Sequence, residues 1–509
     1  MKRTIRTLVL WLLVGIAGAG APRAQDFLLF SHDQLEDVRV NGVNITQPGS
    51  YTVWAWSLDR SPLTLVAGES TFESAPNPKA AEEAYSWKKL GVLEVKETQV
   101  LPLQMYSDPR GRILQPRAVG WLALTQDPGC DFNDLFGMAR VFPDSAQAVQ
   151  DARRGIVRSI EKYYEFPRYE SMRAWLERKR ELEIHILTSM GAYPMPDKTP
   201  LNAKRFGKIE RDDYTVEKVY FESLPGFFAT GNLYSPKGKP GPYPAILCPH
   251  GHWQEGRLVN TDNNSIPGRC INFAKQGYVT LAIDMIGYVD SKQLTHKFGG
   301  EREWLWGLSL HGLQFWNTIR AVDFLLSLDN VDPERIACTG ASGGGTQTYC
   351  LVAADDRVKF AAPVNMISAH YQGGCLCENA PNLRIGANNV EYGAMIAPRP
   401  LIMVSTNQDW TDETPRVEFP AIQSIYRLFD APDRVTWTMI NAEHNYNQAS
   451  REAVYAWFGK WMLGGNDPAK FKEQPFTVEK EEDLRVFPGS LPENAVSQEQ
   501  LVKNWIAQS

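Results

Sequence analysis

Residues 335–346, with the sequence RIACTGASGGGT, decide how the rest of the chain is interpreted. Residues 336–339 are short, apolar and bounded by turn-forming residues, which predicts a buried strand, and residues 347–354 predict a helix. Between them, residues 340–344 fit G-x-S-x-G around Ser342. A strand, a tight turn and a helix are the context in which this pattern forms a nucleophile elbow, whose strained serine needs small neighbours. We therefore take Ser342 as the candidate nucleophile, the alternative being a glycine-rich turn without chemistry.

From about residue 205 onward, strand-like runs alternate with helix-like runs. The predicted strands are 214–221, 231–234, 244–248, 279–283, 336–339, 360–364, 401–404 and 435–440. The predicted helices are 271–275, 313–328, 347–354, 416–429 and 451–463. This alternation predicts an α/β fold, with a mostly parallel sheet that is covered by helices on both faces.

Two residues follow predicted strands in the order that a serine hydrolase of this architecture needs. An α/β-hydrolase carries its serine, acid and histidine in that chain order, at the C-terminal ends of strands. Asp409 follows the strand at 401–404, and His444 follows the strand at 435–440. A neutral imidazole can take the serine proton, while a carboxylate fixes the imidazole tautomer and stabilises the imidazolium. We predict Ser342, Asp409 and His444 as a catalytic triad.

Other carboxylates remain open as the acid of this triad. Asp412 and Glu413 lie in the same loop as Asp409, which is the nearest of the three to the strand end. Glu378 follows the predicted strand at 360–364, a position where some hydrolases place the acid.

The loop HGHW, residues 250–253, follows the strand that usually supplies the second oxyanion N–H. We expect the oxyanion hole to consist of the backbone amide of Gly343 with that of His252 or Trp253.

Bulky side chains follow the predicted strands and are expected to converge over Ser342: Trp253, Tyr288, Trp410 and Tyr446. They would leave a small apolar acyl pocket with a polar rim for sugar hydroxyls. The candidate substrate contacts are Tyr288, Trp410 and Glu378.

The remaining segments predict further domains. Residues 26–140 contain short strand-like runs separated by turns, which predicts a β-sandwich-like domain before the catalytic one. Most of its tryptophans Trp54, Trp56, Trp87 and Trp121 are expected to fill a core rather than bind carbohydrate. Residues 145–200 predict a helical connector with helices at 146–162 and 169–190, residues 201–465 the catalytic domain, and residues 466–509 a polar C-terminal extension.

The composition and residues 1–24 indicate which partners and which compartment to expect. The 509 residues carry a net charge of −6 and no long basic run, which argues against nucleic acid. Residues 1–24 begin with Lys2, Arg3 and Arg6 and continue with an apolar run too short to span a bilayer. They predict a cleaved signal peptide, hence a periplasmic or secreted protein with no membrane partner after cleavage.

The seven cysteines predict no metal site. Cys248 and Cys338 lie in predicted buried strands and are expected to be small core residues. Cys375 and Cys377 lack a second cysteine pair or a nearby histidine pattern, so we expect neither zinc nor any other cofactor.

Residues 170–460 resemble the bacterial acetyl xylan esterase-like, or cephalosporin C deacetylase-like, branch of the α/β-hydrolases. The motifs that carry the resemblance are PGF at 225–227, HGHW at 250–253, DMIGY at 284–288 with Ser291, GASGG at 340–344, APRPL at 397–401 and HNY at 444–446. The resemblance implies Ser342 as nucleophile, His444 as base and Asp409 as acid.

The related glucuronoyl esterases carry an arginine directly after the serine, where this chain has Gly343. Prolyl oligopeptidase-like peptidases share the core, but their large propeller does not fit the N-terminal region.

We therefore predict an exported serine carboxylic-ester hydrolase that removes small acyl groups, above all acetyl, from plant-type polysaccharide or oligosaccharide through an acyl-enzyme. The alternatives are a glucuronoyl-type esterase or a serine peptidase of the same fold. An alternative of another class is a catalytically inert carbohydrate-binding protein, against which the intact Ser342, Asp409 and His444 argue.

Overall fold

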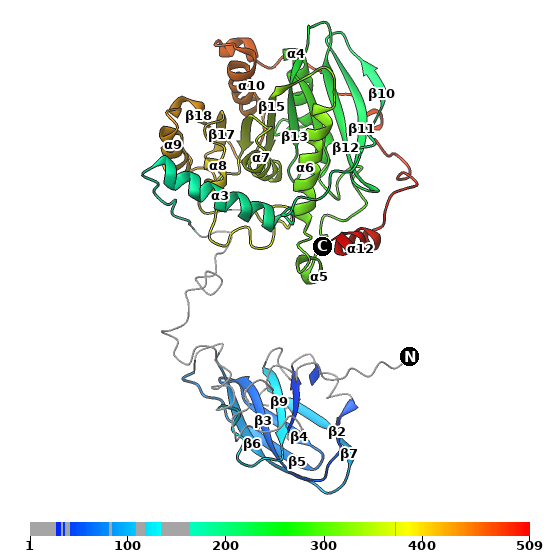
Figure 1. The fold of residues 1–509 in the computed structure, drawn as a ribbon, viewed down its shortest axis with the longest axis vertical. Coiled ribbons are helices and arrows are strands. Elements are labelled where there is room, and N and C mark those ends of the chain that lie inside the picture. Colours follow the sequence, from blue (N-terminus) through cyan, green and yellow to red (C-terminus); the bar gives the residue numbers. More distant parts are fainter. Residues whose placement is uncertain are drawn as a thin grey trace. The chain divides into compact units, whose positions relative to one another are not determined.

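The computed structural model describes residues 27–31, 34–35, 41–80, 84–107, 118–133, 163–371 and 373–508. The chain forms two units, Met1–Gln150 and Asp151–Ser509, which are both drawn in Figure 1. The predicted signal peptide and the predicted helix at 146–162 lie outside the described residues. Among the helices that the structure describes, none is both long and apolar enough to cross a membrane.

The N-terminal unit is built from antiparallel strands. One sheet has four strands in the order β1 (Phe27–Ser31), β9 (Val119–Thr125), β3 (Gly49–Leu58) and β6 (Tyr85–Val95). A second sheet has the order β5 (Ser70–Ser74), β4 (Leu63–Ala67) and β8 (Leu103–Tyr106), and a two-stranded ladder joins β2 (Val43–Ile45) to β7 (Gln99–Leu101). The sequence has strand-like runs at 51–56, 63–66, 90–95 and 118–124, and these correspond to β3, β4, β6 and β9.

The two larger sheets of this unit share one apolar core, as in a β-sandwich. Val53 and Leu122 from one sheet are buried in the same cluster as Leu65 and Leu103 from the other. A smaller cluster holds Trp54 and Trp87, which are both 4% exposed, against Phe132. These two tryptophans therefore fill the core, as the sequence predicted.

The second unit is organised around a nine-stranded sheet, whose labelled strands spread across the unit from β18 to β10 in Figure 1. Its strand order is β10 (Lys204–Glu210), β11 (Tyr214–Leu224), β12 (Phe227–Pro236), β14 (Val279–Ile283), β13 (Tyr243–Pro249), β15 (Val331–Ala341), β16 (Phe360–Val364), β17 (Leu401–Thr406) and β18 (Val435–Ile440). Strands β10 to β12 pair antiparallel, and β12 also pairs antiparallel with β14. The pairs from β14 through β18 are all parallel. Because parallel strands bring their C-terminal ends to one edge, this edge collects the loops that carry the site.

Helices cover both faces of this sheet, and each face has its own apolar core. Residues of α3 (Met172–Ser189), α6 (Leu310–Leu326), α7 (Gly343–Ala354), α8 (Asn389–Ala394) and α9 (Glu418–Leu428) share one core. Residues of α4 (Ile266–Gln276) and α10 (Gln448–Leu463) form the other. Cys248 and Cys338 are fully buried core residues, as predicted. The α/β-hydrolase fold predicted from the sequence is confirmed.

The remaining helices of the described residues are short or C-terminal. They are α5 (Glu301–Trp304), α11 (Glu481–Leu484) and α12 (Gln498–Gln508).

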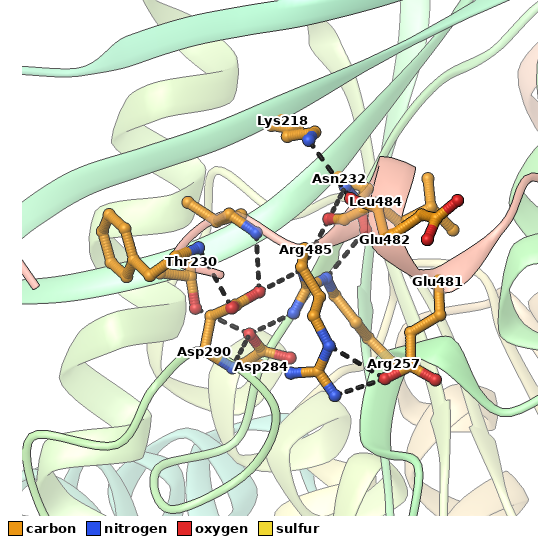
Figure 2. Close-up of polar contacts among 12 residues, drawn as sticks. Lys218, Thr230, Asn232, Arg257, Asp284, Asp290, Glu481, Glu482, Leu484 and Arg485 are labelled. Carbon is orange, nitrogen blue, oxygen red and sulfur yellow. Dashed lines mark hydrogen bonds and ion pairs between the residues drawn. The ribbon is translucent and has the colours of Figure 1, made fainter. Parts of the chain in front are cut away.

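The segment that carries α11 is fastened to the sheet by a buried charge cluster (Figure 2). The Arg257 guanidinium, 1% exposed, pairs with Asp284 and with Asp290 and donates to the Leu484 carbonyl at 3.0 Å. The Asp290 carboxylate also accepts the backbone N–H groups of Val486 and residue 487, at 2.8 and 3.1 Å. Since buried charges are costly unless paired, this cluster fixes the C-terminal extension to one place on the catalytic unit.

Candidate active site

Ser342 lies at a sharp turn between β15 and α7, with φ 58° and ψ −127°. A non-glycine residue in this region is strained and is typical of a nucleophile elbow. The flanking glycines are required by space. A Cβ at Gly340 would lie 2.5 Å from the Pro249 carbonyl oxygen, and one at Gly344 would lie 2.6 Å from the same atom. The geometry therefore presents the serine at the C-terminal edge of the sheet and leaves room only for glycine at positions 340 and 344.

His444 and Asp409 are brought together at the same edge. The His444 Nδ1 atom lies 3.0 Å from Asp409 Oδ2. The other Asp409 oxygen accepts the backbone N–H and the hydroxyl of Thr411, at 2.7 and 2.6 Å. Burial raises the pKa of Asp409, but the hydrogen bonds from His444 and Thr411 outweigh it and hold the pKa below its ordinary value. These contacts favour an ionised Asp409 carboxylate in a position to orient the imidazole.

The second ring nitrogen of His444 is free to act on a substrate. Its Nε2 atom is buried and has no hydrogen-bond partner among the described residues. His444 and Ser342 line the same pocket. A histidine that lines the same pocket as a serine and has one unpartnered nitrogen is a candidate for proton exchange with that serine.

The other candidate acids occupy different surroundings. Glu413 lies beside His370 and Arg416, at 3.7 and 4.0 Å. Glu378 is 3% exposed and lines the pocket, and burial raises its pKa to about 7. Its carboxylate accepts the backbone N–H of Cys375 at 3.2 Å. The contact with His444 thus favours Asp409 over the alternatives that the sequence left open.

The structure narrows the choice among the predicted oxyanion-hole amides, which are those of Gly343, His252 and Trp253. The Trp253 N–H donates to the Gly251 carbonyl at 3.0 Å, so it is already engaged within its own turn. Gly343 begins α7, where the first N–H groups of a helix have no partner inside it. The His252 imidazole lies against Gly343, since a Cβ at position 343 would be 3.2 Å from its Cε1 atom. This leaves the amides of Gly343 and His252 as the better oxyanion candidates, while Trp253 lines the pocket.

Aromatic rings wall a pocket of about 320 Å³ around Ser342. The centre of the Trp410 ring lies 4.5 Å from that of the His444 ring. The Trp253 ring also stacks on His444, with ring centres 6.2 Å apart and planes 9° apart. Tyr371, which the sequence analysis did not single out, lines the pocket 4.5 Å from Trp410. It lies in the long loop after β16, where no motif marks it.

Two of the four predicted wall residues lie elsewhere. Tyr446 is wrong as a wall residue, because it is fully buried, contacts Thr339 Oγ1 at 2.7 Å and lies beneath the Arg269 guanidinium. Tyr288 lines a neighbouring polar pocket of about 680 Å³, which shares His252 with the first. Tyr288 is therefore not among the residues that line the Ser342 pocket, and its contact with substrate stays a prediction.

The cysteine pair 375 and 377, which has no histidine near it in sequence, has two histidines near it in space. His252 and His296 both approach the pair Cys375 and Cys377, and the four potential ligand atoms lie within 4.8 Å of one another. The histidines are distant from the cysteines in sequence, so spacing alone could not reveal them.

The fold and the elbow together define an α/β-hydrolase, with a serine, histidine and carboxylate assembled at the C-terminal edge of its sheet. The family described as acetyl xylan esterase (AXE1) matches residues 202–375. Among solved structures, Methylesterase BT1017 is 30% identical with a TM-score of 0.54, over 67% of this chain and 77% of that one. A glucuronoyl esterase from Solibacter usitatus is 15% identical with a TM-score of 0.45, over 61% of this chain and 100% of that one.

A curated Bacillus subtilis (strain 168) protein, YtaP, named only as a hydrolase, is 28% identical over 176 residues. That match covers 32% of this chain and 57% of the relative, so the chain spans little more than half of that protein's length. The chain belongs to the acetyl xylan esterase-like branch of the α/β-hydrolases, a family of carboxylic ester hydrolases, as its motifs predicted.

Proposed function

We propose that the protein is a serine carboxylic-ester hydrolase that removes small acyl groups, above all acetyl, from plant-type polysaccharide or oligosaccharide. The observation that carries this proposal is the contact of His444 Nδ1 with Asp409, together with an Nε2 that has no partner among the described residues and a His444 that lines the pocket of Ser342. The match to the acetyl xylan esterase family supports the acyl group and the substrate class.

The proposed reaction has two halves. Ser342 Oγ attacks the ester carbonyl carbon while His444 Nε2 takes the serine proton, and Asp409 stabilises the imidazolium. The oxyanion lies between the amides of Gly343 and His252. His444 then returns the proton to the departing sugar hydroxyl, which leaves an acyl-serine. His444 Nε2 then takes a proton from a water molecule, whose oxygen attacks the acyl carbon. The bond from this carbon to Ser342 Oγ breaks, His444 returns the proton to Oγ, and the carboxylic acid departs.

The test is Ser342→Ala in the full chain. Loss of a triad serine typically lowers kcat on the order of 10⁴- to 10⁶-fold. We expect a loss of this size with p-nitrophenyl acetate and with acetylated xylan, alongside an unchanged thermal unfolding curve. Near-normal turnover by the folded variant would contradict the serine mechanism.

A second candidate reaction is cleavage of methyl esters of polymer-borne carboxylates. It is favoured by the 30% identity to a protein named as a methylesterase. Here the polymer would be the acyl part and methanol the leaving group. Acetate and methanol released from acetylated xylan and from methyl-esterified pectin, measured in parallel, would separate the two reactions.

We also propose that the protein is exported, on the strength of the signal-peptide composition of residues 1–24. The N-terminus of protein recovered from the periplasm or medium should begin after residue 21 or 24. Recovery of the uncleaved chain from the cytoplasm would contradict export.

A further inference from the structure

Four side chains with metal-ligating atoms converge at the rim of the Ser342 pocket: His252, His296, Cys375 and Cys377. The two Nε2 atoms of the histidines are 3.2 Å apart. The sulfur of Cys377 lies 3.1 Å from His252 Nε2, and that of Cys375 lies 3.3 Å from His296 Nε2. Both cysteines are free thiols in the structure.

These separations are close to those in a tetrahedral site. With Zn–N near 2.05 Å and Zn–S near 2.3 Å, a tetrahedron has edges of roughly 3.3 Å between nitrogens and roughly 3.6 to 3.8 Å to and between sulfurs. In the structure, the one N–N distance is 3.2 Å and the two N–S distances are 3.1 and 3.3 Å, with all four ligand atoms within 4.8 Å of one another. These distances are near the tetrahedral values. Two thiolates with two imidazoles are a ligand set that selects zinc among the common divalent ions.

Hydrogen bonds from neighbouring groups orient His296 and the loop that carries the two cysteines. His296 Nδ1 lies 2.6 Å from the Ile286 carbonyl oxygen, which can only accept, so Nδ1 carries the ring proton and Nε2 presents a lone pair. The cysteine loop is closed on itself, since Asn379 Nδ2 donates to the carbonyls of Gly373 and Cys375 at 2.8 and 2.9 Å. These are the supporting contacts that orient ligands in protein metal sites.

We propose that His252, His296, Cys375 and Cys377 bind one zinc ion at the rim of the pocket. All four positions of a tetrahedral ion are then filled by protein, which is typical of a structural site rather than a catalytic one. The ester bond is therefore left to Ser342, and the metal site stands independently of the proposed ester hydrolysis.

The ion would join loops that follow three different strands. His252 comes after β13, His296 after β14, and the two cysteines after β16. His252 also carries one of the proposed oxyanion amides, and Cys375 and Glu378 line the pocket. Zinc would thus fix the oxyanion loop and the pocket wall to each other.

The test is metal content of the full-length protein, reduced, loaded with Zn²⁺ and freed of excess ion by gel filtration. We expect one zinc ion per chain by inductively coupled plasma mass spectrometry. We expect little bound zinc in a Cys375→Ser, Cys377→Ser double variant or in His296→Ala. Cys130→Ala, in the N-terminal unit, is the matched control and should keep its zinc. Ser342→Ala should also keep it, which separates this proposal from the proposed reaction.

Replacement of zinc by Co²⁺ in the unaltered protein gives a second readout that needs no variant to fold. Thiolate-to-cobalt charge transfer together with intense visible bands of tetrahedral Co²⁺ would support the site. The proposal is overturned if the loaded protein retains no stoichiometric metal, if the double variant retains as much as the unaltered chain, or if reduced protein re-forms a Cys375–Cys377 disulfide instead of binding zinc.

Discussion

Asp409→Asn probes the proposed triad most sharply, because the surroundings dictate how the new amide must turn. Asp409 Oδ1 accepts two hydrogen bonds from Thr411. The Thr411 hydroxyl itself accepts the Thr406 N–H at 3.1 Å, so its single hydrogen points to Asp409. Asparagine would keep its oxygen at this position and place its NH₂ group where Oδ2 now lies, 3.0 Å from His444 Nδ1.

An NH₂ group donates, so it would bond the imidazole tautomer that has a bare Nδ1 and a protonated Nε2. That tautomer cannot accept the serine proton. We expect kcat to fall by about 10³- to 10⁴-fold, which corresponds to about 4 to 5.5 kcal/mol of transition-state stabilisation, with KM little changed.

The assay is steady-state hydrolysis of p-nitrophenyl acetate by variants whose folding is checked by circular dichroism. Asp412→Asn, in the same loop, is the matched control and should stay close to the unaltered enzyme. A mild effect of Asp409→Asn beside a severe one of Glu378→Gln would refute the reasoning and move the acid to the loop after β16.

Three further outcomes are expected. Glu418 is fully buried, and burial raises its pKa to about 7 from an ordinary 4.5, so the folded state keeps a proton that the unfolded chain releases. Stability should therefore fall as pH rises from about 4.5 to about 7, and Glu418→Gln should show a smaller fall in melting temperature across that window; an identical slope would count against it. Asp290→Asn leaves Arg257 short of a buried partner and should cost about 3 kcal/mol in urea unfolding, whereas Glu481→Gln, at an exposed ion pair, should cost less than about 1 kcal/mol; equal effects would contradict the buried cluster. Acetyl esters should be cleaved faster than butyryl esters, because each methylene that overfills the pocket costs roughly 1–3 kcal/mol, about tenfold or more in rate; faster octanoyl cleavage would rule out a small acyl pocket.

Most of the catalytic fold could be predicted because its strands are buried on both faces. Strands such as β14 and β16 are uniformly buried, and their continuous apolar runs stand out from the polar segments between them. Strand β10 was missed for the opposite reason. Its sequence, KRFGKIE, is almost wholly exposed at the edge of the sheet and carries no apolar alternation.

The triad candidates could be found because each follows a recognisable strand. The pocket walls could not, because the direction of a loop side chain depends on contacts that the sequence does not display. Tyr446 is two residues from His444, yet its hydroxyl turns to Thr339 in the core. Tyr371 reaches the pocket from a loop with no local signal.

The cysteine and histidine cluster shows why spacing rules fail at such an edge. In a zinc finger the ligands come in close pairs along the chain, so the sequence itself carries the pattern. Here only Cys375 and Cys377 are close in sequence, while His252 and His296 follow two other strands. Parallel pairing of β13 with β14 and with β15, and of β15 with β16, brings the ends of these strands together. The ligand set therefore becomes visible only when strand order is known, and the same pairing places the set beside the elbow, because Ser342 follows β15 between them.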